Sequence, residues 1–263
     1  MGYRQARVIE VVGTALCVDR QDWLYAAGDA QVRVYDRAGQ PLRQWKVARA
    51  PSAVAVAADG TVYVGESGQI EVFDSGAKLT RTFNDEGRLG LVTAIGFWRE
   101  FVLVADAKDR SIHRYDRSLR LLGHIGKDNR TKGFLIPNGV LDFDVDAKGI
   151  IHAANPGKHR VERYTCEGQL LGHIGRFDGV DPEGFPGCCN PTNVAVGPSG
   201  QIFVTEKADP RAKVLDANGK LVAVIADRGF DPASKNMDIA VDSKGRVYVA
   251  DAIQRRILVF ENE

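Results

Sequence analysis

Two adjacent cysteines provide the most unusual local chemistry of this chain. Cys188 and Cys189 lie in the segment 184–192, which reads Gly-Phe-Pro-Gly-Cys-Cys-Asn-Pro-Thr. Successive side chains diverge, so neighbouring cysteines do not readily bind one metal ion together. They can form a strained disulfide with each other, or one can be buried while its neighbour faces outward. We therefore interpret the segment as a packed turn, as a redox or metal site shared with a partner, or as a substrate contact.

The other two cysteines, Cys17 and Cys166, show no Cys-x-x-Cys spacing that would indicate a zinc or iron–sulfur site. Cys17 lies in an apolar run that predicts a strand, so we expect a small core residue. Cys166 follows a predicted strand in a hairpin, and we expect it to be exposed.

Side chains with oxygen ligands replace small or apolar residues at matching positions of a repeated sequence pattern. They are Asp142, Asp144, Asn193 and Asp238. If the repeats surround a common axis, these oxygens point toward it and can hold Ca²⁺ or another divalent cation. Alternatively, Asp142 and Asp238 accept backbone N–H groups from a neighbouring turn.

Glu206 is followed by two basic residues, Lys207 and Arg211. An acidic or amide residue recurs at its position in four other repeats, which favours a turn-capping role; these residues are Glu66, Asp106, Asn155 and Asp251. The basic residues distinguish Glu206, because their loop is predicted to lie beside the cysteine pair. The predicted binding rim consists of Cys188, Cys189, Asn193, Glu206, Lys207 and Arg211.

Histidine spacing does not indicate a catalytic triad. His124 and His173 occupy matching places in two Leu-Leu-Gly-His-Ile-Gly phrases, which we interpret as structural positions on outer strands. If the chain is an enzyme, His152 or Glu206 is the candidate acid or base.

The elements that must position these residues follow from six related phrases, at 15–42, 53–79, 93–122, 142–170, 193–221 and 238–260. Each contains alternating apolar runs joined by polar turns, which predicts short antiparallel strands. The third run ends in a bulky residue, followed by Asp and Gly and a fourth run. Repeats of about 40 residues with these signals are typical of a β-propeller, in which four strands form one blade.

The sequence thus predicts an all-β, six-bladed propeller of four-stranded antiparallel blades. It is expected to be a single domain over 1–263, with blades at roughly 13–47, 51–84, 91–126, 140–176, 191–226 and 236–261. The last repeat lacks a fourth strand, and the strand-like segment 6–12 precedes the first. We expect this N-terminal segment to complete the sixth blade and close the ring, which removes an exposed sheet edge.

The repeat resembles the NHL family of propellers over nearly the whole chain. The segment 245–251 has the Gly-x-apolar-Tyr-Val-x-Asp phrase of the family. The segment 157–161, Gly-Lys-His-Arg-Val, matches the Gly-Asn-His-Arg-Ile part of the family pattern. A Gly-Cys-Cys-Asn-Pro segment before Val-Thr-Glu-Lys resembles a bacterial subgroup. Blade three departs from the pattern, because Trp98-Arg99-Glu100 replaces the Asp-Gly hairpin. The resemblance implies the fold and leaves the function open.

Composition limits the function classes. The chain has 35 basic and 34 acidic residues, so it has no overall excess of positive charge for nucleic-acid binding. No apolar run predicts a membrane helix, and no membrane insertion is expected. The polar N-terminus does not resemble a signal peptide, which predicts the cytoplasm; removal of a leader would allow export.

Three long linkers, at 127–137, 176–191 and 226–236, enter blades four to six and share one rim with the loops after the second strands. Loops on a rigid scaffold commonly carry function. We therefore hypothesise a non-catalytic protein-interaction or scaffold module, a subunit of a larger complex, with a protein partner at this rim. The alternative is a metal-assisted lyase, hydrolase or lactonase in the central channel. A weaker hypothesis is binding of single-stranded RNA through Lys127, Arg130, Lys132, Lys207, Arg211 and Lys235.

Overall fold

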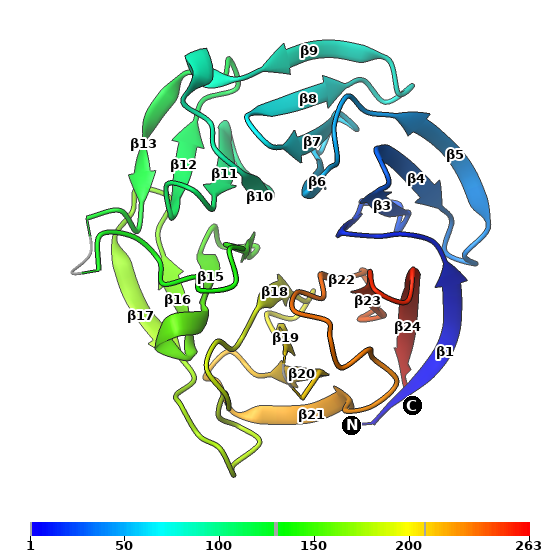
Figure 1. Ribbon diagram of the computed structural model, residues 1–263, viewed down its shortest axis with the longest axis vertical. Helices are drawn as coiled ribbons and strands as arrows, with labels where there is room; N and C mark the ends of the chain where they lie inside the picture. The colour runs from blue at the N-terminus through cyan, green and yellow to red at the C-terminus, as the bar shows by residue number, and fades with distance from the viewer. Residues whose placement is uncertain (1, 129–130, 208) are drawn as a thin grey trace.

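The computed structural model describes residues 2–128, 131–207 and 209–263. Within these ranges the strands form six four-stranded antiparallel sheets arranged as a ring (Figure 1). The predicted all-β class and six-bladed architecture are confirmed. In chain order the strands are β1 (Tyr3–Glu10), β2 (Ala15–Val18), β3 (Leu24–Gly28), β4 (Gln31–Tyr35), β5 (Pro41–Lys46), β6 (Ala53–Val56), β7 (Val62–Glu66), β8 (Gln69–Phe73), β9 (Leu79–Phe83), β10 (Val92–Trp98), β11 (Phe101–Asp106), β12 (Ser111–Tyr115), β13 (Leu121–Ile125), β14 (Phe143–Val145), β15 (Ile151–Asn155), β16 (Arg160–Tyr164), β17 (Leu170–Ile174), β18 (Asn193–Val196), β19 (Ile202–Glu206), β20 (Arg211–Leu215), β21 (Leu221–Ala226), β22 (Ile239–Val241), β23 (Val247–Asp251) and β24 (Arg256–Asn262).

The ring closes through its N-terminal strand. The sixth sheet has the strand order β1-β24-β23-β22, and β1 pairs with β24 from Tyr3 opposite Asn262 to Glu10 opposite Arg256. Figure 1 shows β1 along the outer edge of the sixth blade, with the two termini close together. The predicted closure is consistent with this pairing, although the strand begins before the expected segment.

Aspartate side chains stabilise the hairpins between third and fourth strands. Asp36 Oδ1 accepts the backbone N–H groups of Ala38 and Gln40, both at 2.8 Å. The same pattern recurs after β8 and β20. Blade three departs at another hairpin, between its first and second strands, where a two-residue turn pairs Trp98 with Phe101 and Arg99 takes a φ of 51°. Local turn chemistry thus explains both the repeat and its departure.

The apolar core lies between neighbouring blades. One cluster joins Tyr25 and Val34 of the first blade to Val64 and Phe73 of the second. Similar clusters join the other blades around the ring, so each blade supports the next. This packing fixes the innermost strands, β2, β6, β10, β14, β18 and β22, around the central channel.

The described helices are two short 3-10 turns, η1 (Asp85–Gly87) and η2 (Pro156–Lys158). Across the described part of the chain, no helix has the length and apolar character needed to span a membrane.

Candidate functional site

The long linkers predicted from the sequence precede β14, β18 and β22. They span 126–142, 175–192 and 227–238, and Figure 1 shows them beside blades four to six. Because strands alternate in direction, the linker entering each blade and the loop after its second strand lie at the same end of the ring. We call this end the rim. The linker 175–192 and the loop between β19 and β20 bring most of the predicted binding residues together.

The predicted channel carboxylates connect neighbouring blades. Each accepts a backbone N–H group from the innermost strand of the next blade, which explains why an acidic residue occurs at an otherwise apolar position. These bonds run from Val194 to Asp142 Oδ2 at 2.7 Å, from Val196 to Asp144 Oδ2 at 2.7 Å, and from Leu16 to Asp238 Oδ2 at 2.6 Å.

Burial of these carboxyl groups disfavours their charged forms. It raises the pKa of Asp144 to about 6 and that of Asp238 to about 6. It also raises the pKa of Asp142 well above its usual range, with Asp238 adding repulsion. Asn193 donates to Asp238 Oδ1 at 3.3 Å, and its own Oδ1 is buried without a hydrogen-bond partner among the described residues.

The channel cavity is small, with a volume of about 150 Å³. Asp142, Asp144 and Asp238 line it, together with apolar side chains. They do not form a group of three whose ligand atoms lie within 4.8 Å of one another; in the described ranges only a group in blade three does so. The predicted cation ligands therefore surround one channel without converging on one point.

The two adjacent cysteines occupy different environments. Cys188 is exposed, Cys189 is buried, and their Sγ atoms lie 3.0 Å apart as free thiols. The hydrogen bond with Cys189 and the charge of Lys207 lower the pKa of Cys188, whereas burial raises the pKa of Cys189. Cys188 is therefore the more readily ionised thiol, the form that reacts with electrophiles and oxidants.

Of the other two cysteines, Cys17 is half-buried and lines the channel, whereas Cys166 is buried. Burial raises the pKa of Cys17 to about 12 and that of Cys166 to about 11. The expectation that Cys166 is exposed is wrong, because it is buried between blades three and four. Its hairpin packs on the preceding blade, where Arg114 donates to the carbonyl of Cys166 at 2.9 Å.

Glu206 lies beneath the rim and is fully buried. Its carboxylate bonds Arg211 through Oε2 and lies 2.7 Å from Lys213 Nζ through Oε1. Lys213 is also fully buried, and burial lowers its pKa although Glu206 opposes this effect. Both carboxylate oxygens of Glu206 thus have cationic partners, Arg211 and Lys213. Glu206 therefore stabilises the rim from inside the blade.

The buried side chain of Lys213 binds the inner side of the linker 175–192. Its ammonium group donates to the carbonyls of Pro182 at 2.9 Å and Gly184 at 2.5 Å, and it lies 4.2 Å from the ring centroid of Phe185. Phe185 is completely buried against Gly175, where any side chain would collide with the ring. The sequence interpretation missed Lys213, since a single lysine in a short strand usually faces solvent.

The other end of this linker is held by Asn190. Its side chain donates to the carbonyls of Pro186 at 2.8 Å and Lys207 at 3.2 Å, and it accepts the Lys207 N–H at 2.8 Å. Asn190 is buried, and the peptide bond to Pro191 is cis. These bonds place Lys207 beside the cysteine pair, as the sequence predicted.

Before these two anchors in the chain, the linker exposes two large apolar side chains. Phe177 is 63% exposed and Val180 is 95% exposed. An ion pair between Arg176 and Asp181, and a bond from the Phe185 N–H to the Arg176 carbonyl at 2.8 Å, stabilise this segment.

Lys213 donates hydrogen bonds to its linker, whereas the acidic and amide residues at the ends of the other second strands accept hydrogen bonds from theirs. Glu66, Asp106, Asn155 and Asp251 each accept a backbone N–H group from the preceding linker. This agrees with the turn-capping interpretation. In blade five Lys213 instead donates to linker carbonyls, and Glu206 pairs with Lys213 and Arg211.

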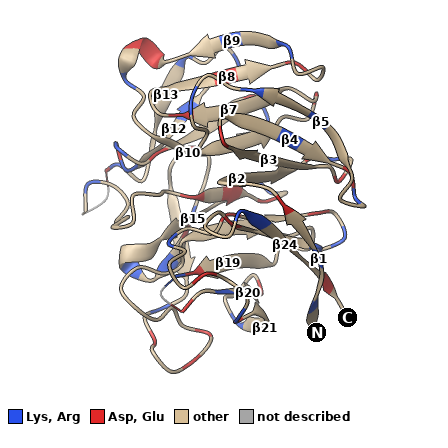
Figure 2. Ribbon diagram, turned by 45° about the vertical axis from the view of Figure 1, so that its right-hand side comes forward, with Lys and Arg blue, Asp and Glu red and all other residues tan. Residues whose placement is uncertain are grey.

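The predicted rim residues therefore belong to three groups. The exposed Cys188, the buried Cys189 and Lys207 lie beside one another. Glu206 and Arg211 form a supporting ion pair, and Asn193 belongs to the channel wall. Arg130, one of the proposed RNA-binding residues, lies outside the described residues. Figure 2 shows basic and acidic residues interspersed over the ring.

Together, the six blades and the closing strand define a six-bladed β-propeller. No protein-family model matches the chain, and neither does any curated protein sequence. The resemblance of the repeat to the NHL family thus has no support from those comparisons.

Three solved structures with a similar fold come from proteins of different kinds. A streptogramin B lyase structure has 11% identity and a TM-score of 0.64, covering 94% of this chain and 78% of that chain. The WD40 propeller domain of Doa1 has 12% identity and a TM-score of 0.66, covering 100% and 97%. A chain of the mitotic checkpoint complex has 11% identity and a TM-score of 0.67, covering 98% and 91%. At these identities the similarity concerns the fold alone.

Proposed function

We propose that this chain is a non-catalytic, NHL-like propeller that acts as a protein-interaction or scaffold module within a larger complex. A protein partner docks at the rim of blades four to six. The linker 175–192 supplies the central contacts, and Lys207 and Cys188 lie beside it.

The observation that carries this proposal is the combination of a fixed backbone and exposed apolar side chains in one linker. Lys213 and Asn190 anchor the backbone from Pro182 onward. A bond from the Phe185 N–H to the Arg176 carbonyl holds the segment that precedes these anchors. Phe177 and Val180 lie in that preceding segment and are largely exposed. A preorganised apolar contact loses little conformational entropy on binding, and aromatic side chains commonly provide such contacts.

Charge distribution favours a protein partner over RNA. Of the basic residues considered for RNA binding, Lys127 pairs with Asp109 and Arg211 pairs with Glu206. The overall charge is nearly balanced. Nucleic-acid binding depends on basic groups that are available to phosphates, so these pairings disfavour that hypothesis.

The proposal is tested by affinity purification from an extract of the source organism. The loop variant Phe177→Ser/Val180→Ser is compared with the native chain and with the control Leu42→Ser/Leu79→Ser. The control removes side chains of 45% and 47% exposure from the outer strands of blades one and two. We expect a stoichiometric partner to remain with the native chain and the control and to be lost with the loop variant. Equal recovery with all three proteins would contradict the proposal.

The alternative is a metal-assisted lyase or hydrolase with a site in the channel. The observations in its favour are three carboxyl groups that line one cavity and the Asn193 Oδ1 that lacks a hydrogen-bond partner in the described structure. Adding Ca²⁺ after chelation should then raise the melting temperature of the native chain and leave that of Asp142→Asn/Asp238→Asn unchanged. No response of the native chain would exclude Ca²⁺ from this channel.

A further inference from the structure

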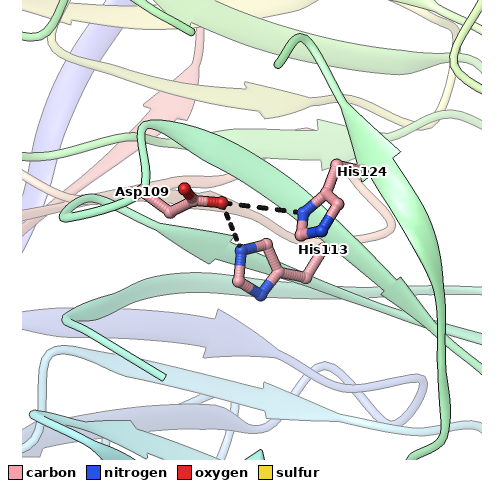
Figure 3. A group of neighbouring side chains, drawn as sticks. All are labelled: Asp109, His113 and His124. Carbon is pink, nitrogen blue, oxygen red and sulfur yellow. Dashed lines mark hydrogen bonds and ion pairs between the residues drawn. The ribbon is translucent and has the colours of Figure 1, made fainter. Parts of the chain in front are cut away.

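Three side chains able to bind a metal ion meet in blade three, near the rim (Figure 3). Asp109 lies in the loop between β11 and β12, His113 lies in β12, and His124 lies in β13. The two histidines are cross-strand partners, and their rings are perpendicular with centroids 4.6 Å apart. Because directly opposite residues project from the same face of a sheet, the pairing brings both imidazoles to the Asp109 carboxylate.

The separations match those of ligands around one small ion. Asp109 Oδ2 lies 2.9 Å from His113 Nε2 and 3.6 Å from His124 Nδ1. Nitrogen and oxygen ligands bind Zn²⁺ at about 2.0–2.1 Å with tetrahedral geometry, which places ligand atoms roughly 3.3 Å apart. The two separations lie on either side of that value. Small side-chain movements would therefore bring the three ligand atoms to the spacing that a zinc ion requires.

Hydrogen bonding around His113 independently points to a cation. The Tyr115 hydroxyl donates a hydrogen bond to Asp85 Oδ2 at 3.0 Å. The hydroxyl therefore accepts a hydrogen bond from His113 Nδ1 at 3.2 Å. In a neutral imidazole this leaves a lone pair on Nε2, which faces the Asp109 carboxylate. A proton or a metal ion must lie between the two lone pairs.

His124 provides a second unsatisfied ligand atom. Its Nδ1 is buried and makes no hydrogen bond within the described structure, although it faces Asp109. An imidazole nitrogen that carries no proton can bind a metal ion through its lone pair.

We infer that Asp109, His113 and His124 form a binding site for a divalent metal ion, and that Zn²⁺ suits this set of ligands best. Two imidazoles and one carboxylate are a common set of three protein ligands for Zn²⁺, which leave a fourth position for water or a small anion. This site is separate from the channel and from the linker 175–192.

The surroundings are compatible with an exchangeable ligand. A pocket of about 410 Å³ adjoins the three side chains, and Arg88, Lys108 and Lys127 are among its lining residues. Lys127 Nζ lies 3.0 Å from each oxygen of Asp109, so it can retain Oδ1 when Oδ2 binds the metal. Tyr115 orients His113 through its other nitrogen, as the neighbours of metal ligands usually do.

The test measures Zn²⁺ binding to the full chain after removal of metal with a chelator. Cys188→Ser/Cys189→Ser is used as the background, so that thiolates near the rim do not contribute. Equilibrium dialysis with elemental analysis gives the stoichiometry, calorimetry gives the affinity, and Co²⁺ absorption reports the ligand geometry. The variants are His124→Ala and Asp109→Asn, and circular dichroism and melting curves check that each is folded.

His173→Ala is the matched control, because His173 occupies the equivalent place in blade four, opposite Glu162. We expect one Zn²⁺ per chain in the background protein and in the control. His124→Ala and Asp109→Asn should weaken binding by at least about tenfold, since changes to the neighbours of ligands alone cost 10–100-fold. No stoichiometric Zn²⁺ in the background protein, or equal affinity in folded His124→Ala, would overturn the inference and leave a proton between His113 and Asp109.

Discussion

Replacing Lys213 with methionine should detach the linker 175–192 from blade five. Methionine preserves much of the apolar stem and removes the ammonium group, which contacts Glu206 Oε1 at 2.7 Å and the carbonyls of Pro182 and Gly184. The substitution therefore tests the buried charge with little change in side-chain volume.

The magnitude follows from the partners that remain. Removing one member of a buried ion pair costs about 3–5 kcal/mol, because the other charge loses its compensation. Arg211 still bonds Glu206 in the variant, so we expect the lower end, about 3 kcal/mol. For a chain of this size such a loss lowers the melting temperature by roughly 6–12 °C.

The assay is urea unfolding of the native chain, Lys213→Met, Glu206→Gln and the double variant. We expect the two single changes to be coupled by about 0.5–3 kcal/mol, as is usual for groups in direct contact. Lys244→Met is the control, because Lys244 is exposed in a hairpin at the other end of the ring. If Lys213→Met unfolds within about 0.5 kcal/mol of the native chain, as surface changes do, Lys213 does not anchor the linker.

Three further predictions concern ring closure, thiol reactivity and pH. Deleting residues 1–12 should lower the free energy of unfolding by more than about 3 kcal/mol. The deletion removes the buried side chains of Ile9 and Val11, each worth about 1.5 kcal/mol or more, and it leaves β24 as an edge strand. An unchanged urea midpoint would refute closure through β1. Alkylation of the native protein at neutral pH, read by mass spectrometry, should modify Cys188 well before Cys17 and Cys166, whose thiol pKa values are raised; uniform labelling would contradict the environments described. The folded-state pKa of Asp144 is raised to about 6, so the native state holds its proton more tightly than the unfolded state, and the contribution of this group to stability falls as pH rises from about 4 to about 6. The stability of Asp144→Asn relative to the native chain should therefore increase over that window in urea titrations, and a difference independent of pH would show that burial does not perturb this carboxyl group.

The fold could be predicted from the sequence because its determinants are local. Alternating apolar residues set the strands, and Asp36 and its equivalents set the turns through bonds to residues two and four positions later. Closure could be predicted because one repeat lacked a strand and another segment supplied it. The channel position of Asp142 and Asp238 followed from aligning the repeats.

The chemistry beneath the rim could not be predicted in the same way, because it depends on how linkers fold over the blades. Lys213 is buried by a linker that precedes it by some thirty positions along the chain, as its bonds to Pro182 and Gly184 show. His113 and His124 meet through strand register, which the matching phrases around His124 and His173 did not reveal. One available signal was a polar residue at the centre of the third strand in five repeats, namely Arg33, Glu71, His113, Glu162 and Lys213.

The central claim is that a protein partner docks at the rim of blades four to six. The most direct test is cross-linking of the purified complex with a lysine-reactive reagent, followed by mass spectrometry. The rim provides Lys132, Lys207 and Lys235, and the hairpins at the other end of the ring provide Lys148 and Lys244 as internal controls. We predict cross-links to the partner from the rim lysines and none from Lys148 or Lys244. Cross-links confined to Lys148 and Lys244 would contradict the claim.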